Sequence, residues 1–240
     1  MTVAKSTILR RIKPMKENKL LRGLCVLTAA LMLGLTGCAN GSDTNDSDAQ
    51  SQAATAEVQS AWTELDQTTI TKEMGMGWNL GNQLEASNAG IPSETTWGNP
   101  TISEDLIKAV KEQGFKTVRI PVSYLDKIGA APDYTIDSAW LDRVQEVVDY
   151  VVGNDLYAII NIHGDGYYTV DKSWLRCVDD NQDEIKDKYE KVWAQIADRF
   201  KDYDQHLIFE SMNEESDNTY GKPNAIGYEN INAYNQIFVD

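Results

Sequence analysis

The dipeptide Asn213-Glu214 follows an apolar run that begins at Leu207. A partly buried carboxyl group beside a second carboxylate keeps its proton at higher pH than usual, so that it can act as a general acid and then as a base. The neighbouring amide of Asn213 can both donate and accept hydrogen bonds. These two residues are therefore the first candidates for a catalytic site, with Glu214 as the acid/base.

Three earlier apolar runs also carry polar residues at or near their carboxyl ends. Asn79 and Asn82 end the first run, Arg119 lies in the second, and His163 ends the third. Polar groups in otherwise apolar strands are costly to bury without partners, so four successive strands with this feature indicate one shared pocket. The alternatives are a structural ion pair for Arg119 and a hydrogen-bonded core position for His163.

The elements that must position these residues alternate along the chain. We expect strands at 74–80, 117–122, 157–162 and from 207, and helices after Ser103, after Asp137, around 185–200 and at 227–240. Ser103 and Asp137 are typical helix N-caps. Nearly continuous apolar strands that alternate with helices are typical of a parallel sheet covered by helices.

Two architectures fit this pattern, an open doubly wound sheet and a (β/α)8 TIM barrel. A nucleotide-binding doubly wound fold requires a glycine-rich turn after its first strand, but residues 75–80 (GMGWNL) have Leu80 in place of the third glycine. We therefore favour the barrel, whose active sites form at the carboxyl ends of the strands.

Residues 1–37 have the features of a signal peptide. Basic residues precede an apolar segment at 24–35, which is too short for a membrane span of about 20 residues. The ending Leu-Thr-Gly-Cys resembles a bacterial lipobox, which implies cleavage before Cys38 and lipidation of its thiol; an ordinary signal peptide is the alternative. We expect a secreted bacterial lipoprotein on the cell surface that contacts the membrane only through its lipid.

The rest of the chain divides into a flexible polar linker at 38–60 and a globular part at 61–240. The formal net charge is −15, and removal of residues 1–37, which carry a charge of +6, changes it to −15 − 6 = −21. Such acidity disfavours nucleic acid as a partner. Two distant histidines and a single cysteine in the globular part give no zinc-binding spacing, so we expect neither a metal nor a cofactor.

Several motifs together resemble glycoside hydrolase family 5, in particular its bacterial endoglucanase and xyloglucanase branch. They are 75–82 (GMGWNLGN), 97–100 (WGNP), 114–124 (GFKTVRIPVSY), 157–163 (YAIINIH) and 207–214 (LIFESMNE). The resemblance implies a (β/α)8 barrel, of which this chain holds about the first four βα units. It also implies Glu214 as acid/base, Asn213 as an amide that orients the sugar, Arg119 as support for the nucleophile, and His163 as the histidine of strand three.

The implied activity is the retaining hydrolysis of β-1,4-glucan by a complete enzyme that acts as a monomer. Asn79, Asn82, Trp97 and Tyr167 are the expected substrate-binding residues, because sugar rings stack on aromatic faces. The family's nucleophile lies late in the chain, so we expect it beyond residue 240 and expect the 240-residue chain alone to be inactive. A mannanase or xyloglucanase on the same scaffold and a non-catalytic glycan-binding surface lipoprotein are the alternatives.

Two positions depart from the family pattern. Gly164 stands where the branch often has a second histidine, which leaves the substrate preference open. Glu215 stands where it often has proline, and strand alternation predicts that this side chain points away from the site.

Overall fold

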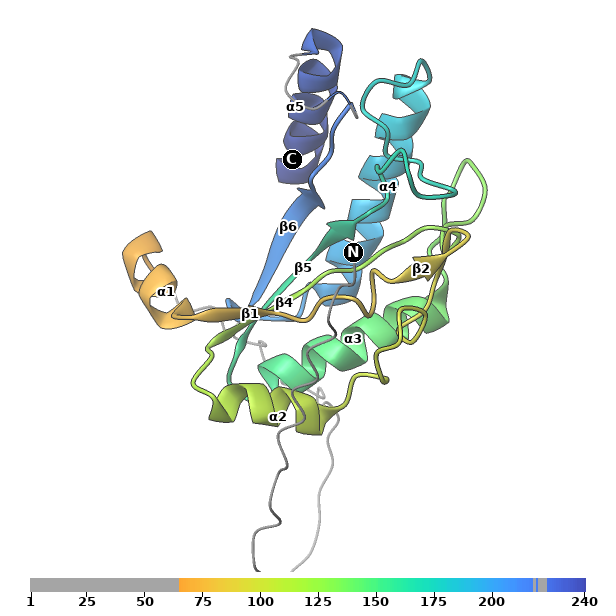
Figure 1. Cartoon of the computed structure of the whole chain (residues 1–240). Helices are drawn as coiled ribbons and strands as arrows, with labels where there is room; N and C mark the ends of the chain where they lie inside the picture. The colour runs from red at the N-terminus through yellow and green to blue at the C-terminus, as the bar shows by residue number, and fades with distance from the viewer. Residues whose placement is uncertain (1–64, 218, 220–223) are drawn as a thin grey trace, which may run out of the picture. The chain divides into compact units, whose positions relative to one another are not determined.

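The computed structural model describes residues 65–217, 219 and 224–240 (Figure 1). The predicted signal peptide at 1–37, the predicted lipidation site Cys38 and the linker at 38–60 lie outside the described residues. Within the described part of the chain, no helix is long and apolar enough to cross a membrane.

Four parallel strands form the central sheet. They are β1 (Gly77–Asn79), β4 (Thr117–Ile120), β5 (Tyr157–His163) and β6 (Leu207–Asn213). Their spatial order, β1-β4-β5-β6, is also their order along the chain (Figure 1). A doubly wound sheet reverses its strand order at a switch point, whereas this sheet advances in one direction, as predicted for the first units of a barrel.

The predicted helices are present, and their caps explain where they begin. They are α2 (Glu104–Glu112), α3 (Ser138–Val152), α4 (Gln182–Phe200) and α5 (Ala225–Val239). Ser103 accepts a hydrogen bond from the amide of Leu106 at 3.3 Å, and Asp137 accepts one from the amide of Trp140 at 2.9 Å. Helix α5 begins two residues before the predicted start, because Asn224 caps it.

The predicted start of the first strand at Met74 is wrong. Met74 ends a helix, α1 (Gln67–Met74), and β1 begins only at Gly77. Asp66 starts α1 by accepting hydrogen bonds from the amides of Thr68 and Thr69. Helix α1 buries none of its residues, so it lacks the apolar periodicity by which a helix is predicted.

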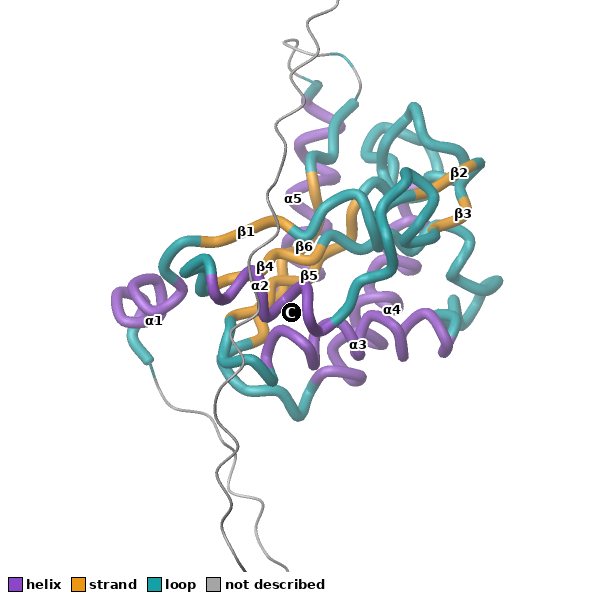
Figure 2. Tube along the Cα trace, turned by 60° about the horizontal axis from the view of Figure 1, so that its bottom comes forward, coloured by secondary structure: helices purple, strands orange, loops and turns teal. Residues whose placement is uncertain are grey.

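The two faces of the sheet differ in polarity. Val118, Ile120, Ile160 and Ile162 are buried in a core shared with apolar residues of α2, α3 and α4. The alternate positions point to the opposite face and carry polar side chains at the carboxyl ends of the strands. A short hairpin that was not predicted, β2 (Ser87–Asn88) with β3 (Ile91–Pro92), lies among the loops (Figure 2).

Candidate active site

Arg119 forms the centre of a polar cluster at the carboxyl ends of the strands. Its Nε and Nη2 donate to the two carboxylate oxygens of Glu210, at 2.7 and 2.5 Å. Its Nη1 donates to Asn79 Oδ1 at 3.1 Å, and Nη2 also donates to Asn213 Oδ1 at 2.8 Å. The structure therefore brings together three residues that the sequence predicted separately, and adds Glu210, which was not predicted.

Glu210 is held in its ionised form. Burial alone would raise the pKa of this carboxyl group, but hydrogen bonds from Arg119 and from Asn161 Nδ2, the latter at 2.9 Å, outweigh it and lower the pKa. The same pair raises the pKa of Arg119 above its ordinary value. The sequence left open whether Arg119 is a site residue or a structural ion-pair partner. In the structure it is an ion-pair partner that lies within the candidate site. A glutamate inside the apolar run LIFESMN was the sequence signal for Glu210.

A β-bulge in β6 places Glu210 and Asn213 on the same face. Along β5, Asn161 and His163 are two residues apart, but their partners on β6, Glu210 and Asn213, are three apart. The bulge accommodates the extra residue, so that both β6 side chains reach Arg119. The bulge is supported from α4: the Ser211 carbonyl accepts hydrogen bonds from the Tyr189 hydroxyl at 2.9 Å and from the Trp193 indole at 3.2 Å.

Glu214 follows β6 directly. Its side chain is exposed in the part of the chain that the structure describes, so the predicted partial burial of Glu214 is wrong there. Its backbone is left-handed, with a φ of 50°. The Tyr167 hydroxyl donates to Glu214 Oε2 at 3.3 Å and accepts from Asn213 Nδ2 at 2.5 Å. Glu214 is thereby connected to Arg119 through two intervening side chains.

Glu215 does not join this cluster, in agreement with the predicted orientation. Neither of its carboxylate oxygens has a hydrogen-bond partner, and both are buried.

His163 ends β5 beside Tyr167, with the two ring centroids 6.2 Å apart in an edge-on arrangement. Burial, and then the positive charge of Arg119, lower the pKa of His163 to about 4. The imidazole is therefore neutral at neutral pH and can exchange hydrogen bonds with a hydroxyl group.

A cavity of about 130 Å³ lies beside His163, and Asn82, Trp97 and Tyr167 also line it. The Trp97 side chain is 52% exposed, and its indole nitrogen donates to the Ser87 carbonyl at 2.9 Å, so that one edge is fixed while the ring remains accessible. Three of the four predicted substrate-binding residues therefore meet in one cavity. Asn79, the fourth, is a partner of Arg119 instead.

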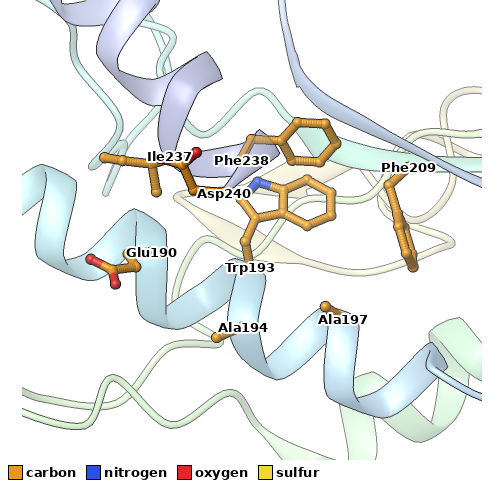
Figure 3. Close-up of a pocket in the computed structure, with 8 residues that line it drawn as sticks. All are labelled: Glu190, Trp193, Ala194, Ala197, Phe209, Ile237, Phe238 and Asp240. Carbon is orange, nitrogen blue, oxygen red and sulfur yellow. The ribbon is translucent and has the colours of Figure 1, made fainter.

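A larger cavity of about 550 Å³ lies elsewhere, between α4 and α5 (Figure 3). Six of the eight residues that line it are apolar, among them Trp193, Phe209 and Phe238, and the other two are Glu190 and Asp240. It lacks the converging polar groups of the Arg119 cluster, so we assign the chemistry to that cluster and to the smaller cavity, which share Tyr167. In the part of the chain that the structure describes, no three His, Cys, Asp or Glu residues are grouped so that they could hold a metal ion.

Comparison with known proteins identifies the family of this chain. Residues 82–240 match the family model "Cellulase (glycosyl hydrolase family 5)". Endoglucanase A of Paenibacillus barcinonensis is 60% identical over 171 residues, which are 71% of this chain and 43% of that protein. This chain therefore spans less than half the length of that relative.

Solved structures show the same fold. A family 5 xyloglucanase from Paenibacillus pabuli in complex with ligand superposes with a TM-score of 0.70 at 62% identity, over 71% of this chain and 47% of that one. A broad specificity endoglucanase from Ruminococcus champanellensis with bound cellotriose gives a TM-score of 0.67 at 42% identity, over 75% of this chain and 53% of that one. The match to the family model covers well over half of the sequence, and the chain belongs to glycosyl hydrolase family 5, the cellulase family.

Proposed function

We propose that the complete protein is a retaining hydrolase of β-1,4-glucans in which Glu214 is the acid/base. The observation that carries this proposal is the position of Glu214, directly after a parallel strand and hydrogen-bonded to Tyr167 at the edge of the Trp97 cavity. Glu214 protonates the leaving oxygen while a second carboxylate attacks the anomeric carbon. It then takes a proton from the water that releases the sugar from that carboxylate.

The second carboxylate, in our proposal, lies outside residues 1–240. Glu210 is an unsuitable nucleophile because Arg119 occupies both of its oxygens. The chain also spans only 43% of Endoglucanase A and 47% of the xyloglucanase chain that it matches. The 240-residue chain alone should therefore release no reducing sugar.

Xyloglucan is the second candidate substrate. The observation in its favour is the 62% identity to a structure described as a xyloglucanase. Gly164 leaves space beside Tyr167, since a Cβ there would come no closer than 3.9 Å to the Tyr167 ring.

The test is hydrolysis of carboxymethylcellulose, xyloglucan and glucomannan by the complete protein. Glu214→Gln should lower the rate by about 10²- to 10⁴-fold, because it removes the general acid. Glu229→Gln, an exposed change on α5, is the matched control and should leave the rate unchanged. Full activity of Glu214→Gln, or activity of the 240-residue chain, would contradict the proposal. Hydrolysis of glucomannan alone would support a mannanase instead.

We further propose that the protein is a secreted lipoprotein attached to the cell surface through Cys38, on the basis of its N-terminal sequence. Cys38→Ala should move the protein from the membrane fraction to the medium or periplasm. An unchanged distribution would favour an ordinary signal peptide.

A further inference from the structure

The carboxyl group of Glu215 is buried next to the proposed catalytic residue. Both of its oxygens are buried without a hydrogen-bond partner, and none of the ion pairs among the described residues includes it. An isolated buried carboxylate is strongly disfavoured, so the group must be uncharged in the folded protein. It therefore occupies its site as a packing group.

The space for this carboxyl group is provided by Gly166. A Cβ atom at that position would lie 1.4 Å from Glu215 Oε2 and 2.2 Å from Glu215 Cδ. The backbone of Gly166 is not left-handed, so the glycine is required by this close approach and not by its conformation. Gly166 and Glu215 thus fit together across two loops, the one after β5 and the one after β6.

Among the described residues, the titratable groups that interact electrostatically with Glu215 are acidic or neutral. They are Asp165, Tyr167 and Cys177 from the loop after β5, Tyr189 from α4, and Tyr234 from α5. Burial, and then the charge of Asp165, raise the pKa of Glu215 to about 9. Glu215 is consequently protonated at neutral pH.

Two adjacent contacts join the same two loops. Gly166 packs on Glu215, and the next residue, Tyr167, donates a hydrogen bond to Glu214. The left-handed backbone of Glu214 lets its side chain meet Tyr167 at the surface while the Glu215 side chain is buried. The packing contact and the hydrogen bond therefore lie next to each other, between neighbouring residues of the same two loops.

We infer that Glu215 is a positioning residue, whose uncharged carboxyl group, packed against Gly166, holds the Tyr167 hydroxyl on Glu214. This inference deepens the proposed function, on which its relevance to catalysis rests. Its test measures contacts within the 240-residue chain and no hydrolysis, so that failure of one proposal can be distinguished from failure of the other.

The first experiment follows the ring signals of Tyr167 by NMR, in chain labelled with ¹³C-tyrosine and with the signal assigned through Tyr167→Phe. Glu214→Gln should shift the Tyr167 signal in the wild-type chain and in Glu215→Gln, which preserves shape and neutrality. The shift should disappear in Glu215→Ala. If Glu214→Gln shifts the signal equally in the Glu215→Ala chain, Glu215 does not position Tyr167 and the inference is overturned.

The second experiment tests the contact with Gly166. Gly166→Ala should lower the thermal midpoint of the wild-type chain by about 5 °C or more, as expected for overpacking. It should have a much smaller effect in Glu215→Ala, where the clash is absent, and its full effect in the control Glu229→Ala. Equal effects in all three chains would overturn the inference. If Glu215→Ala does not unfold cooperatively, Glu215→Ser, whose side chain is also too short to pack against Gly166, replaces it in the NMR experiment.

Discussion

Arg119 and Glu210 are joined by two parallel hydrogen bonds, one to each carboxylate oxygen. Together with the hydrogen bonds to Asn79 and Asn213, they engage four of the five N–H groups that an arginine offers. Only one N–H group, on Nη1, is left for another partner. The positive charge of Arg119 is therefore balanced among the described residues, and a single directed donor remains.

Glu210→Gln should destabilise the protein by about 1–3 kcal/mol, because it leaves a partly buried guanidinium without its counter-charge. Urea unfolding at pH 7 measures this change. The pKa of Glu210 is lowered in the folded state, so its stabilising contribution is present above the ordinary value of 4.5 and is lost as the pH falls through the folded pKa. The wild-type and Glu210→Gln curves should therefore converge in acid.

Glu146→Gln is the matched control for that experiment. Glu146 also pairs with an arginine, Arg143, but its side chain is 51% exposed, so its loss should cost less than about 1 kcal/mol. Equal losses for the two variants would show that the Arg119–Glu210 pair is no stronger than an exposed pair.

His163 should titrate near pH 4. Its pKa is lowered on folding, so the unfolded chain binds the proton more tightly and stability is lost as the pH falls from about 6.5 towards 4, by at most ~3 kcal/mol. The chain contains two histidines, and His206→Gln leaves one imidazole signal to follow by NMR. Titration of that signal near 6.5 would contradict the burial of the His163 imidazole.

Trp97→Ala should weaken the binding of cello-oligosaccharides by the complete enzyme about tenfold, because it removes an exposed aromatic face from the cavity. The turnover number should change by no more than about twofold, since no hydrogen bond among the described residues joins Trp97 to the Glu214 carboxylate. The comparison is Met76→Ala, which changes an apolar residue of similar exposure, 60%, outside that cavity. If both variants bind alike, Trp97 is not part of the substrate site.

Tyr189→Phe should lower the free energy of unfolding by about 1 kcal/mol, because the Ser211 carbonyl in the bulge loses one of its two side-chain donors. Tyr228→Phe removes a hydroxyl from a side chain that is 58% exposed and should have no measurable effect. Chemical denaturation of the two variants side by side gives the comparison.

The parts of the fold that were predicted from sequence are those governed by local chemistry. Ser103 and Asp137 begin helices because their side chains accept hydrogen bonds from amides three residues ahead. The apolar spacing of α3 is likewise local, and all six of its predicted apolar positions are buried. Helix α1 was not predicted because it buries no side chain, so its sequence contains no periodic signal.

The sequence predicted most residues of the candidate site but not the contacts between them. Asn213, Arg119 and Asn79 do converge, as polar residues at one end of a parallel sheet must. Glu210 was missed because strict alternation along β6 places it and Asn213 on opposite faces, and only the bulge brings them together. A bulge depends on pairing with the neighbouring strand, which a single sequence does not reveal.

That bulge also determines how the segment from Glu210 to Asn213 responds to a change in its number of residues. Replacing Met212 by another residue leaves the count of residues unchanged, so Asn213 should keep its place beside Arg119. Deleting Met212 would remove the bulge and place Asn213 two residues after Glu210, a spacing at which regular alternation keeps both side chains on the same face. The bulge thus compensates for the additional residue between Glu210 and Asn213, and the loss of that residue should leave both side chains facing Arg119.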